Sequence, residues 1–378
     1  MRNILISLIF IFLVALFPDS VYSQTVNGSI NQITSSDMES YVDFLASPLL
    51  KGRMNGEGEL EIAAQYIASQ AKLLGLKPAN GNSYFQPFTV LRNIKDPEKP
   101  PMQIILNNKD TITIEDQRYH LGQPVSDRSK EMEEVKVLNN IAACIEGSDS
   151  LLKKEVVVYS SHYDHIGTTN GKINAGADDD ASGCAALLSI AKAFQSLEKK
   201  PLRSILFLWV SGEEIGLFGS EFYVENPLFP LEKTLVDLNL DMVGREKMAA
   251  DSTSETPMTG PTSVFVITDN QSNELAVIAK EVDNRTSLDF DYSLSGRYHP
   301  LQLFARSDHY NFVKKDIPIL CFTTGIHTDY HTPGDVVSRL DFKKMEMVAK
   351  SVYEIGFIIA SNKRRLVNDN PYSKWGKH

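Results

Sequence analysis

Between residues 155 and 361 the sequence alternates short apolar segments with longer amphipathic ones, and this alternation constrains the fold more than any other feature. The apolar segments resemble strands that are buried on both faces, and the amphipathic segments have helical spacing. Strands that alternate with helices predict an α/β fold with a largely parallel, buried central sheet. The expected strands are 155–163, 204–212, 235–244, 263–268 and 318–325, and the expected helices are 181–197, 216–225, 273–284 and 340–361.

Residues 36–76, upstream of this alternation, predict two N-terminal helices. Ser36-Asp37-Met38-Glu39 fits a capping box at a helix start, and Pro48 helps to end that helix. Residues 58–75 place apolar side chains at helical spacing and close with Gly75, a common helix stop.

Residues 89–136 differ from the rest of the chain because they are polar, with only short β-like patches. We expect a surface excursion that contains a hairpin there. No repeat, low-complexity tract or linker divides residues 24–378 convincingly, so we expect a single domain.

The first 23 residues have the three parts of a secretory signal. Arg2 gives a positive start, residues 4–17 are apolar, and Val21-Tyr22-Ser23 is a plausible cleavage site. A retained membrane anchor is the alternative, but the apolar run is shorter than the ~20 residues that a span needs. We therefore expect an exported protein, periplasmic or extracellular, with no stable membrane span after cleavage.

The net charge limits the classes of binding partner, and the cysteine content limits the number of disulfide bonds. The formal net charge of −10 argues against a nucleic-acid partner, because phosphate binding needs a basic face. The odd, sparse set of Cys144, Cys184 and Cys321 is not a disulfide framework. Cys144 and Cys321 lie in strand-like apolar runs, which favours buried free thiols and leaves one disulfide as the alternative.

Acidic and imidazole side chains gather where the expected strands end, which is where open α/β sheets bind their ligands. The clusters are His162, Asp164 and His165; Asp178, Asp179 and Asp180; Glu213 and Glu214; Asp241; and His327, Asp329, Tyr330, His331 and Asp335. Each cluster alone has an ordinary explanation, such as a structural histidine, a solvated surface or a helix N-terminus. Five clusters on one rim instead predict a metal site, because a cation offsets the repulsion of adjacent carboxylates.

The types of ligand atom limit which metals the site would bind. Histidine nitrogen and carboxylate oxygen without thiolate suit zinc first, then cobalt or manganese, whereas calcium prefers oxygen ligands alone. Two histidines and several carboxylates can hold two ions if one carboxylate bridges them. One aspartate of the stretch GADDDASG, residues 176–183, would then be the bridge.

Five motifs occur in a fixed order: SSHYDHIG, GADDDASG, SGEEIGLFGS, NLDMVGR and HTDYHTPGD. Together they closely resemble the dizinc aminopeptidase family of secreted bacterial leucyl aminopeptidases, metallopeptidase family twenty-eight. The upstream stretch SPLLKGRMNGEGELEIAAQYIASQAKLLGLKP is also similar, so the resemblance covers roughly residues 36–360. It implies a phosphorylase/hydrolase-like, three-layer α/β/α fold with a mixed, mostly parallel central sheet, and two Zn²⁺ per chain.

Carried over position by position, the resemblance makes His162 and Asp241 ligands of one zinc, and Glu214 and His331 ligands of the other. The bridging carboxylate is the second acid of G-x-x-D-D, which is Asp179. The family also has a cis peptide bond directly after this bridging residue, so we expect one here.

The resemblance assigns catalytic roles as well. Glu213 would be the general base that takes a proton from a water shared by the two zincs and delivers it to the leaving amine. Tyr330 would stabilise the tetrahedral oxyanion. Asp164 fits the carboxylate that orients the metal-bound imidazole of His162.

Other polar residues receive supporting roles. Asp178 and Asp180 would support the site without binding metal, and Asp335 could orient His331. We expect His165 and His327 near the metals but not bound to them, Ser307-Asp308-His309 in a pocket wall or a structural role, and residues 52–56 in a turn beside the pocket.

The leading hypothesis is an exported zinc aminopeptidase that removes N-terminal residues from peptides with a free N-terminus. A single-zinc glutaminyl cyclase, which forms N-terminal pyroglutamate, is an alternative that the retained Asp-Asp pair and Glu-Glu-Ile-Gly-Leu context disfavour. A zinc carboxypeptidase of the same fold stays open, because Arg245 or Arg306 could bind a substrate carboxylate. A non-enzymatic domain without metals is disfavoured because every expected ligand type is present.

Overall fold

The computed structural model describes residues 28–93, 102–105, 111–114, 119–121, 133–251 and 257–374. The expected signal, residues 1–23, lies outside the described residues, as does much of the expected surface excursion. Within the described part, no helix is long and apolar enough to cross a membrane.

A ten-stranded mixed sheet runs through the molecule in the order β13-β12-β14-β11-β7-β10-β6-β2-β5, with β1 paired to β6. Its centre is parallel and consists of β14 (Ile319–Thr323), β11 (Thr234–Leu240), β7 (Val156–His162) and β10 (Ser204–Val210). Because these four strands are adjacent and parallel, their carboxyl ends meet at one edge of the sheet.

Antiparallel pairs flank this centre on both sides. Beyond β14 lies antiparallel β12 (Ser263–Ile267), which pairs in parallel with β13 (Asp289–Asp291). Beyond β10 lie β6 (Glu133–Ile145), β2 (Phe85–Asn93), β5 (Tyr119–Leu121) and β1 (Lys77–Pro78), all in antiparallel pairs. The remaining strands form two small hairpins, β3 (Met102–Ile105) with β4 (Thr111–Ile114) and β8 (Thr168–Thr169) with β9 (Lys172–Ile173).

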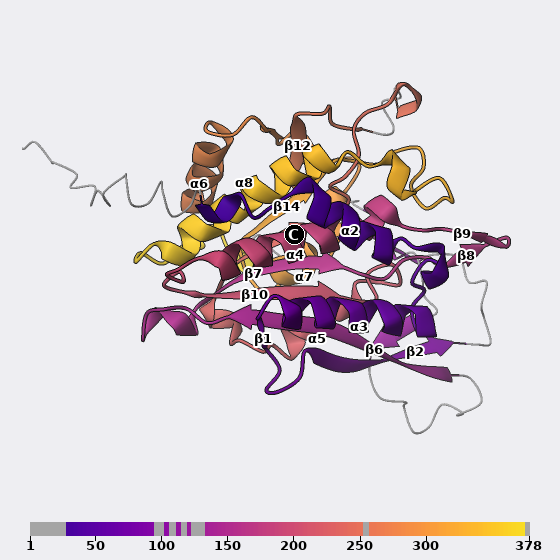
Figure 1. Ribbon diagram of the computed structural model, residues 1–378, viewed down its shortest axis with the longest axis horizontal. Coiled ribbons are helices and arrows are strands. Elements are labelled where there is room, and N and C mark those ends of the chain that lie inside the picture. Colours follow the sequence, from indigo (N-terminus) through magenta and orange to yellow (C-terminus); the bar gives the residue numbers. More distant parts are fainter. Residues whose placement is uncertain are drawn as a thin grey trace, which may run out of the picture.

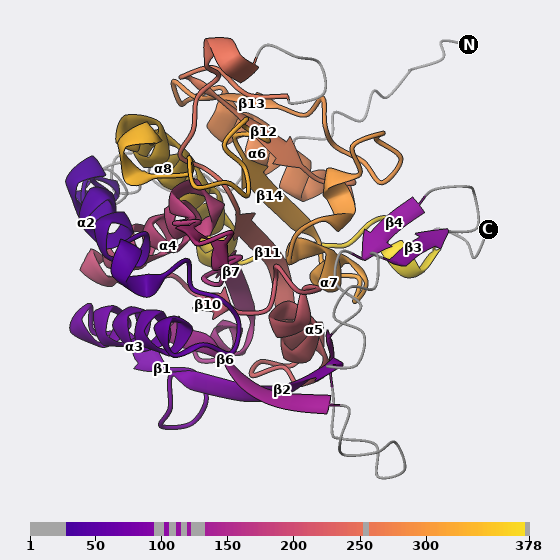
Figure 2. The same cartoon turned by 90° about the vertical axis from the view of Figure 1, so that its right-hand side faces the viewer.

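Helices cover both faces of the sheet, which gives the expected three layers. Figure 2 shows α2, α3, α4 and α8 on one side of the strands and α5 and α7 on the other. The first face carries α2 (Ser35–Leu45), α3 (Gly58–Leu73), α4 (Gly183–Ser196), α6 (Asn273–Asp283) and α8 (Phe342–Ser361). The second carries α5 (Phe218–Glu225) and α7 (His309–Val313). On the first face α2 packs against α4 and α8 (Figure 1).

Burial explains why the sequence signals were clear in the centre of the sheet. Every residue of β7, β10 and β11 is buried, so these strands are mostly apolar and have no solvent-facing side. The cysteines follow the same pattern: Cys184 and Cys321 are buried, Cys144 is half-buried, and all three thiols are free. The alternative of one disulfide is therefore not realised.

The prediction for residues 89–136 was only partly correct. The expected hairpin is present as β3 and β4, but both ends of the segment belong to long strands of the main sheet, β2 and β6. Only the end of strand β6, around Cys144, was recognised as strand-like, because the part before it alternates sides: Val137 is 59% exposed whereas Leu138 is 1% exposed. A half-solvated antiparallel strand has many polar residues and lacks the continuous apolar run of a central strand.

Candidate metal centre

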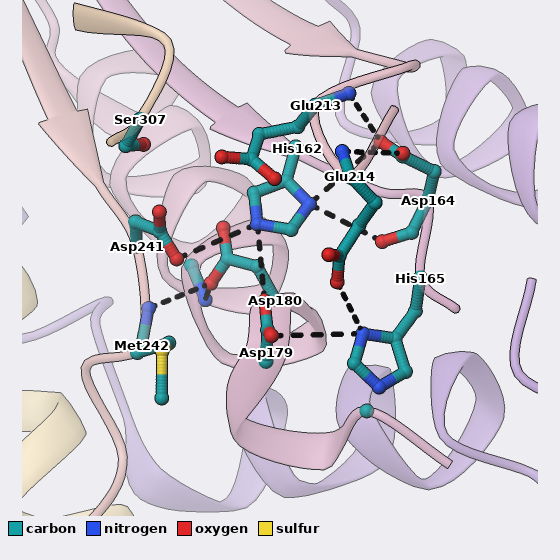
Figure 3. Close-up of polar contacts among 12 residues, drawn as sticks. His162, Asp164, His165, Asp179, Asp180, Glu213, Glu214, Asp241, Met242 and Ser307 are labelled. Carbon is teal, nitrogen blue, oxygen red and sulfur yellow. Dashed lines mark hydrogen bonds and ion pairs between the residues drawn. The ribbon is translucent and has the colours of Figure 1, made fainter. Parts of the chain in front are cut away.

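The carboxyl ends of the four central strands bring the predicted site residues together (Figure 3). His162 is the last residue of β7, Glu213 and Glu214 follow β10, and Asp241 follows β11. His331 lies in the loop that follows β14. Parallel order at one edge thus gathers residues that are far apart in the sequence.

Asp179 reaches the same place from a tight turn, Ala177–Ser182, that leads directly into α4. Gly176 begins this turn with a φ of 61°, and a Cβ there would lie 2.3 Å from the carbonyl oxygen of Asp179. Only glycine fits such an approach of backbone to backbone. The Asp179–Asp180 peptide bond is cis, as the resemblance predicts.

The two carboxylate oxygens of Asp179 face two separate groups of donor atoms. Oδ1 lies 3.2 Å from His162 Nε2, which itself lies 3.4 Å from Asp241 Oδ1. Oδ2 lies 3.2 Å from His331 Nε2, which lies 3.0 Å from Glu214 Oε2. A carboxylate in this position can bind one cation through each of its oxygens.

The donor atoms fit a metal better than they fit one another. Within the described residues, His331 Nε2 and Asp241 Oδ1 are buried and have no hydrogen-bond partner despite their close neighbours. Buried polar atoms without partners are rare in folded proteins. The two groups, His162, Asp179 and Asp241, and His165, Asp179, Glu214 and His331, each place their ligand atoms within 4.8 Å of one another. Nitrogen and carboxylate donors in such groups suit zinc.

The electrostatics of the centre favour added positive charge. Burial alone would lower the pKa of His331, but the neighbouring Asp179 and Glu214 carboxylates raise it to about 10. Burial would likewise lower the pKa of His162, yet the Glu213 and Asp241 carboxylates raise it well above its ordinary value. The same field that favours protonated imidazoles favours metal cations.

His165 is the residue that the sequence analysis placed nearby but outside the metal site. Its Nδ1 lies 2.7 Å from Glu214 Oε1 and 3.6 Å from Asp179 Oδ2 (Figure 3). The structure therefore adds a second imidazole, beside that of His331, to the group around Glu214. Its place directly after Asp164, in the strand-end motif, is the signal that could have pointed to it.

Asp164 lies behind the site, and its backbone carbonyl oxygen is closer to the His162 ring than its carboxylate is. The ring Nδ1 of His162 lies 3.2 Å from the carbonyl oxygen of Asp164 and 3.7 Å from its carboxylate. That carboxylate accepts hydrogen bonds from the backbone N–H groups of Glu213 and Glu214 and from the side chain of Asn55. Asp164 thus fixes the turn that carries both glutamates.

Residues 52–56, expected as a turn beside the pocket, supply Arg53, which the sequence analysis did not single out. Its fully buried guanidinium donates hydrogen bonds to five carbonyl oxygens. Two of them, on Gly176 and Asp179, belong to the turn that carries the Asp179 carboxylate. No local sequence pattern marks these contacts, because the acceptors lie more than 100 residues downstream.

The expectation that Asp335 orients His331 was wrong. Its carboxylate accepts hydrogen bonds of 2.9–3.1 Å from the backbone N–H groups of Asp178 and Asp179. His331 has a φ of 56°, which turns the chain before it reaches Asp335. Asp335 therefore holds the Asp179 loop, and His327, expected near the metals, pairs with Asp178 at 3.4 Å outside both donor groups.

Asp178 and Asp180 occupy the supporting positions that were expected. Asp178 Oδ1 accepts from the backbone N–H of Gly244 at 2.6 Å. Asp180 accepts from the Ser161 hydroxyl at 2.7 Å and from the backbone N–H of Met242 at 3.1 Å. Each neighbouring carboxylate thus has its own donors, which offsets their mutual repulsion.

A pocket of about 60 Å³ opens beside the donor atoms and contains the remaining predicted residues. Glu213 and Tyr330 line it, and the Tyr330 ring stacks on the His331 ring at 3.8 Å. Ser307 and His309 form part of its wall, whereas Asp308 turns away and accepts from the Ser220 hydroxyl at 2.5 Å. Met242, Ile267 and Cys321 give the interior an apolar surface.

Comparisons with known proteins identify the family of the chain. Residues 140–355 match the family model described as "Peptidase family M28". A probable leucine aminopeptidase of Arthroderma otae is 29% identical over 218 residues, covering 54% of this chain and 55% of that protein. The chain spans about half the length of the first curated relatives that it matches.

Solved structures share the fold at low identity. BSAP, a zinc aminopeptidase from Bacillus subtilis, matches with a TM-score of 0.59 at 17% identity, over 88% of this chain and 97% of that one. Porphyromonas gingivalis glutaminyl cyclase matches with a TM-score of 0.56 at 14% identity, over 85% and 97%. At these identities the likeness shows the fold alone, so the choice between activities depends on the site residues.

Proposed function

The chain belongs to peptidase family M28, and from this premise we propose that it is an exported zinc aminopeptidase that hydrolyses N-terminal residues from peptides. One observation carries the proposal: the two oxygens of Asp179 face two separate donor groups, with Glu213 lining the adjoining pocket. The secretory features of residues 1–23 support export.

The donor residues fall into two groups, one for each proposed zinc ion. His162, Asp179 and Asp241 would hold one ion, and Asp179, Glu214 and His331 the other, with His165 beside the second. When bound, zinc supplies Lewis acidity that polarises a peptide carbonyl and makes water acidic near neutral pH. Asp164, Asp335 and Arg53 hold the loops on which these ligands lie.

Glu213 is suited to move the proton. Burial, with contributions from Glu214 and Asp241, raises its pKa well above the ordinary value for a glutamate. A carboxylate with a raised pKa accepts a proton from the attacking water more readily and can then release it to the leaving amine. Its backbone N–H is held by Asp164, so the side chain is directed from a fixed turn.

Tyr330 is suited to stabilise the charge that develops on the carbonyl oxygen. Burial and the nearby Asp179 and Glu214 carboxylates raise the pKa of its phenol well above the ordinary value, so the hydroxyl stays protonated. A protonated phenol in the pocket can donate a hydrogen bond to an oxyanion. Its stacking on His331 fixes the ring plane.

The number of zinc ions tests the proposal. We expect the dialysed protein to contain close to two zincs per chain by plasma mass spectrometry, and to release free N-terminal residues from short peptides. One zinc per chain, together with pyroglutamate formation from an N-terminal glutamine peptide, would instead support the cyclase. Absence of metal after incubation with zinc would contradict both enzymes. Sequencing the N-terminus of the protein recovered outside the cytoplasm tests export separately.

A further inference from the structure

Arg306 is the one arginine on the wall of the site pocket within the described residues, and the reaction proposed above does not use it. It follows the short helical turn Leu303–Ala305 and lines the pocket together with Glu213 and Tyr330. Its side chain is exposed, and it forms no hydrogen bond or ion pair with the part of the chain that the structure describes. An arginine at the mouth of a pocket is thus left without a counter-charge.

Arg245, the other arginine considered from the sequence, cannot play this part. It is 1% exposed, its Nη2 donates to Asp329 Oδ2 at 2.8 Å, and its Nη1 lies 4.0 Å from Asp335 Oδ1. A buried and paired guanidinium is not free to bind a substrate. The structure therefore separates a structural arginine from an unpaired one.

The position of Arg306 is fixed by its neighbours. Phe304, before it, is 1% exposed, and Ser307 and Asp308, after it, are 6% and 0% exposed. Arg306 therefore lies on a segment anchored at both ends, in the wall of the pocket that Tyr330 also lines.

The pocket is therefore negatively charged beside the donor groups and positively charged at its exposed mouth, where Arg306 lies. The carboxylates of Asp179, Glu214 and Asp241 lie at the metal groups, where they attract cations such as a substrate ammonium. The apolar interior, with Met242 and Ile267, suits an uncharged first side chain. A group bound by Arg306 at the exposed mouth would therefore belong to the residue after the cleaved bond.

We propose that Arg306 binds a carboxylate on the second residue of the peptide substrate, so that the enzyme prefers substrates with negative charge there. This inference rests on the proposed aminopeptidase function. Two sources carry the same chemistry: the terminal carboxylate of a dipeptide, and the side chain of Asp or Glu at position two. Guanidinium and carboxylate form paired, charge-assisted hydrogen bonds that an amide cannot replace.

Four substrates distinguish the terminal carboxylate of a dipeptide from a side-chain carboxylate at position two. Leu-Ala is compared with Leu-Ala-amide, and Leu-Glu-amide is compared with Leu-Gln-amide. Each pair differs by one charge at the second residue while the cleaved bond stays the same. The proteins are the wild type, Arg306→Gln, Arg306→Lys and the control Arg364→Gln, which removes a positive charge from a residue that does not line the pocket.

For the wild type we expect kcat/KM to be about 10- to 100-fold higher for the charged member of at least one pair, as a charge-assisted hydrogen bond allows. Arg306→Gln should abolish this preference mainly through KM, Arg306→Lys should keep part of it, and Arg364→Gln should keep all of it. Zinc content should equal the wild-type value in every variant. Which pair shows the preference identifies the source of the carboxylate.

Two results would overturn the inference while the aminopeptidase stands: hydrolysis of all four substrates without preference for charge, or a preference that survives in Arg306→Gln. If the zinc-loaded wild type hydrolyses none of the four, the proposed function itself fails, and this inference fails with it.

Discussion

Three consecutive aspartates of one turn have three different partners. Asp178 accepts from the backbone of Gly244, Asp180 accepts from Ser161 and the backbone of Met242, and only Asp179 turns both oxygens to the donor groups. Adjacent carboxylates can coexist here because each is compensated from a different direction. A carboxylate run is thus converted into one ligand and two supports.

At this scale the sequence predicted which side chains gather, but not the residues that support them. Four of the five proposed ligands follow or end a strand, Asp179 comes from the turn before α4, and the structure brings all five together. The hydrogen bonds of Asp335 to the Asp179 loop join residues about 156 positions apart, and no local pattern announces such a pair. The contact of His165 with Glu214 depends on side-chain direction at a strand end, which periodicity does not fix.

Replacing Glu213 with Gln should reduce kcat by about 10²- to 10⁴-fold, because the amide cannot accept the proton. Zinc content should be unchanged, since Glu213 belongs to neither donor group. Steady-state kinetics and metal analysis on the same preparation check both statements. Glu221→Gln, on α5 and away from the pocket lining, is the matched control. Near-normal turnover in Glu213→Gln would exclude it as the base.

Replacing His165 with Ala should weaken zinc binding about 10- to 100-fold, because Glu214 loses the ring nitrogen that lies 2.7 Å away. Titration calorimetry with zinc on the metal-free protein measures the effect without any activity assay. His165→Asn should recover much of the affinity, since its amide can place a donor near the position of Nδ1. Wild-type affinity in His165→Ala would show that this contact does not matter.

At the scale of elements, the site depends on how α4 meets β11. Gly183 is the first residue of α4, and a Cβ there would lie 2.4 Å from the carbonyl oxygen of Leu240 and 2.5 Å from Asp180 Oδ2. The helix start therefore lies directly against the end of β11, one residue before Asp241. This close approach places the Asp179 turn beside the central strands.

Gly183→Ala should destabilise the protein by more than about 2 kcal/mol and reduce its zinc content, because the added methyl displaces Asp180 or Leu240. Gly58→Ala is the matched control: Gly58 is the first residue of α3 and has nothing within 4 Å of its Cβ position. That change should be neutral or slightly stabilising, as alanine favours helix. Equal urea midpoints for the two variants would contradict the packing argument.

Element prediction succeeded where burial was uniform and failed where it alternated. The five expected strands from 155 to 325 correspond to β7, β10, β11, β12 and β14. The first part of strand β6 was not recognised because one of its faces is partly solvated, and the long pairing of β6 with β2 cannot be deduced from either strand alone. The sheet is accordingly wider on its antiparallel side than the sequence suggested.

At the scale of the whole molecule, the N-terminal segment completes the site. Arg53 donates to carbonyl oxygens at the end of α2, just after β7 and in the Asp179 turn, and Asn55 donates to Asp164. The family match begins only at residue 140. Residues outside the matched region therefore hold the loops that carry the ligands.

Arg53→Met should destabilise the protein by more than about 3 kcal/mol, because five carbonyl oxygens lose their donor in a buried position. Urea unfolding gives the free energy, and plasma mass spectrometry should find less bound zinc. Arg285→Met, which removes a surface pair with Glu354, should cost less than about 1 kcal/mol. A small effect at Arg53 would show that the carbonyls find water instead.

The contacts of Arg53 also determine when the site can form during synthesis of the chain. Its acceptors on the Asp179 loop are made 122 to 126 residues later, which at typical rates of synthesis is roughly 6 to 25 seconds. Until then these contacts cannot form and the Asp179 carboxylate does not exist, and His331 is made later still. A nascent chain therefore lacks a complete set of the proposed metal ligands until His331 has been added. Before that point it cannot be active.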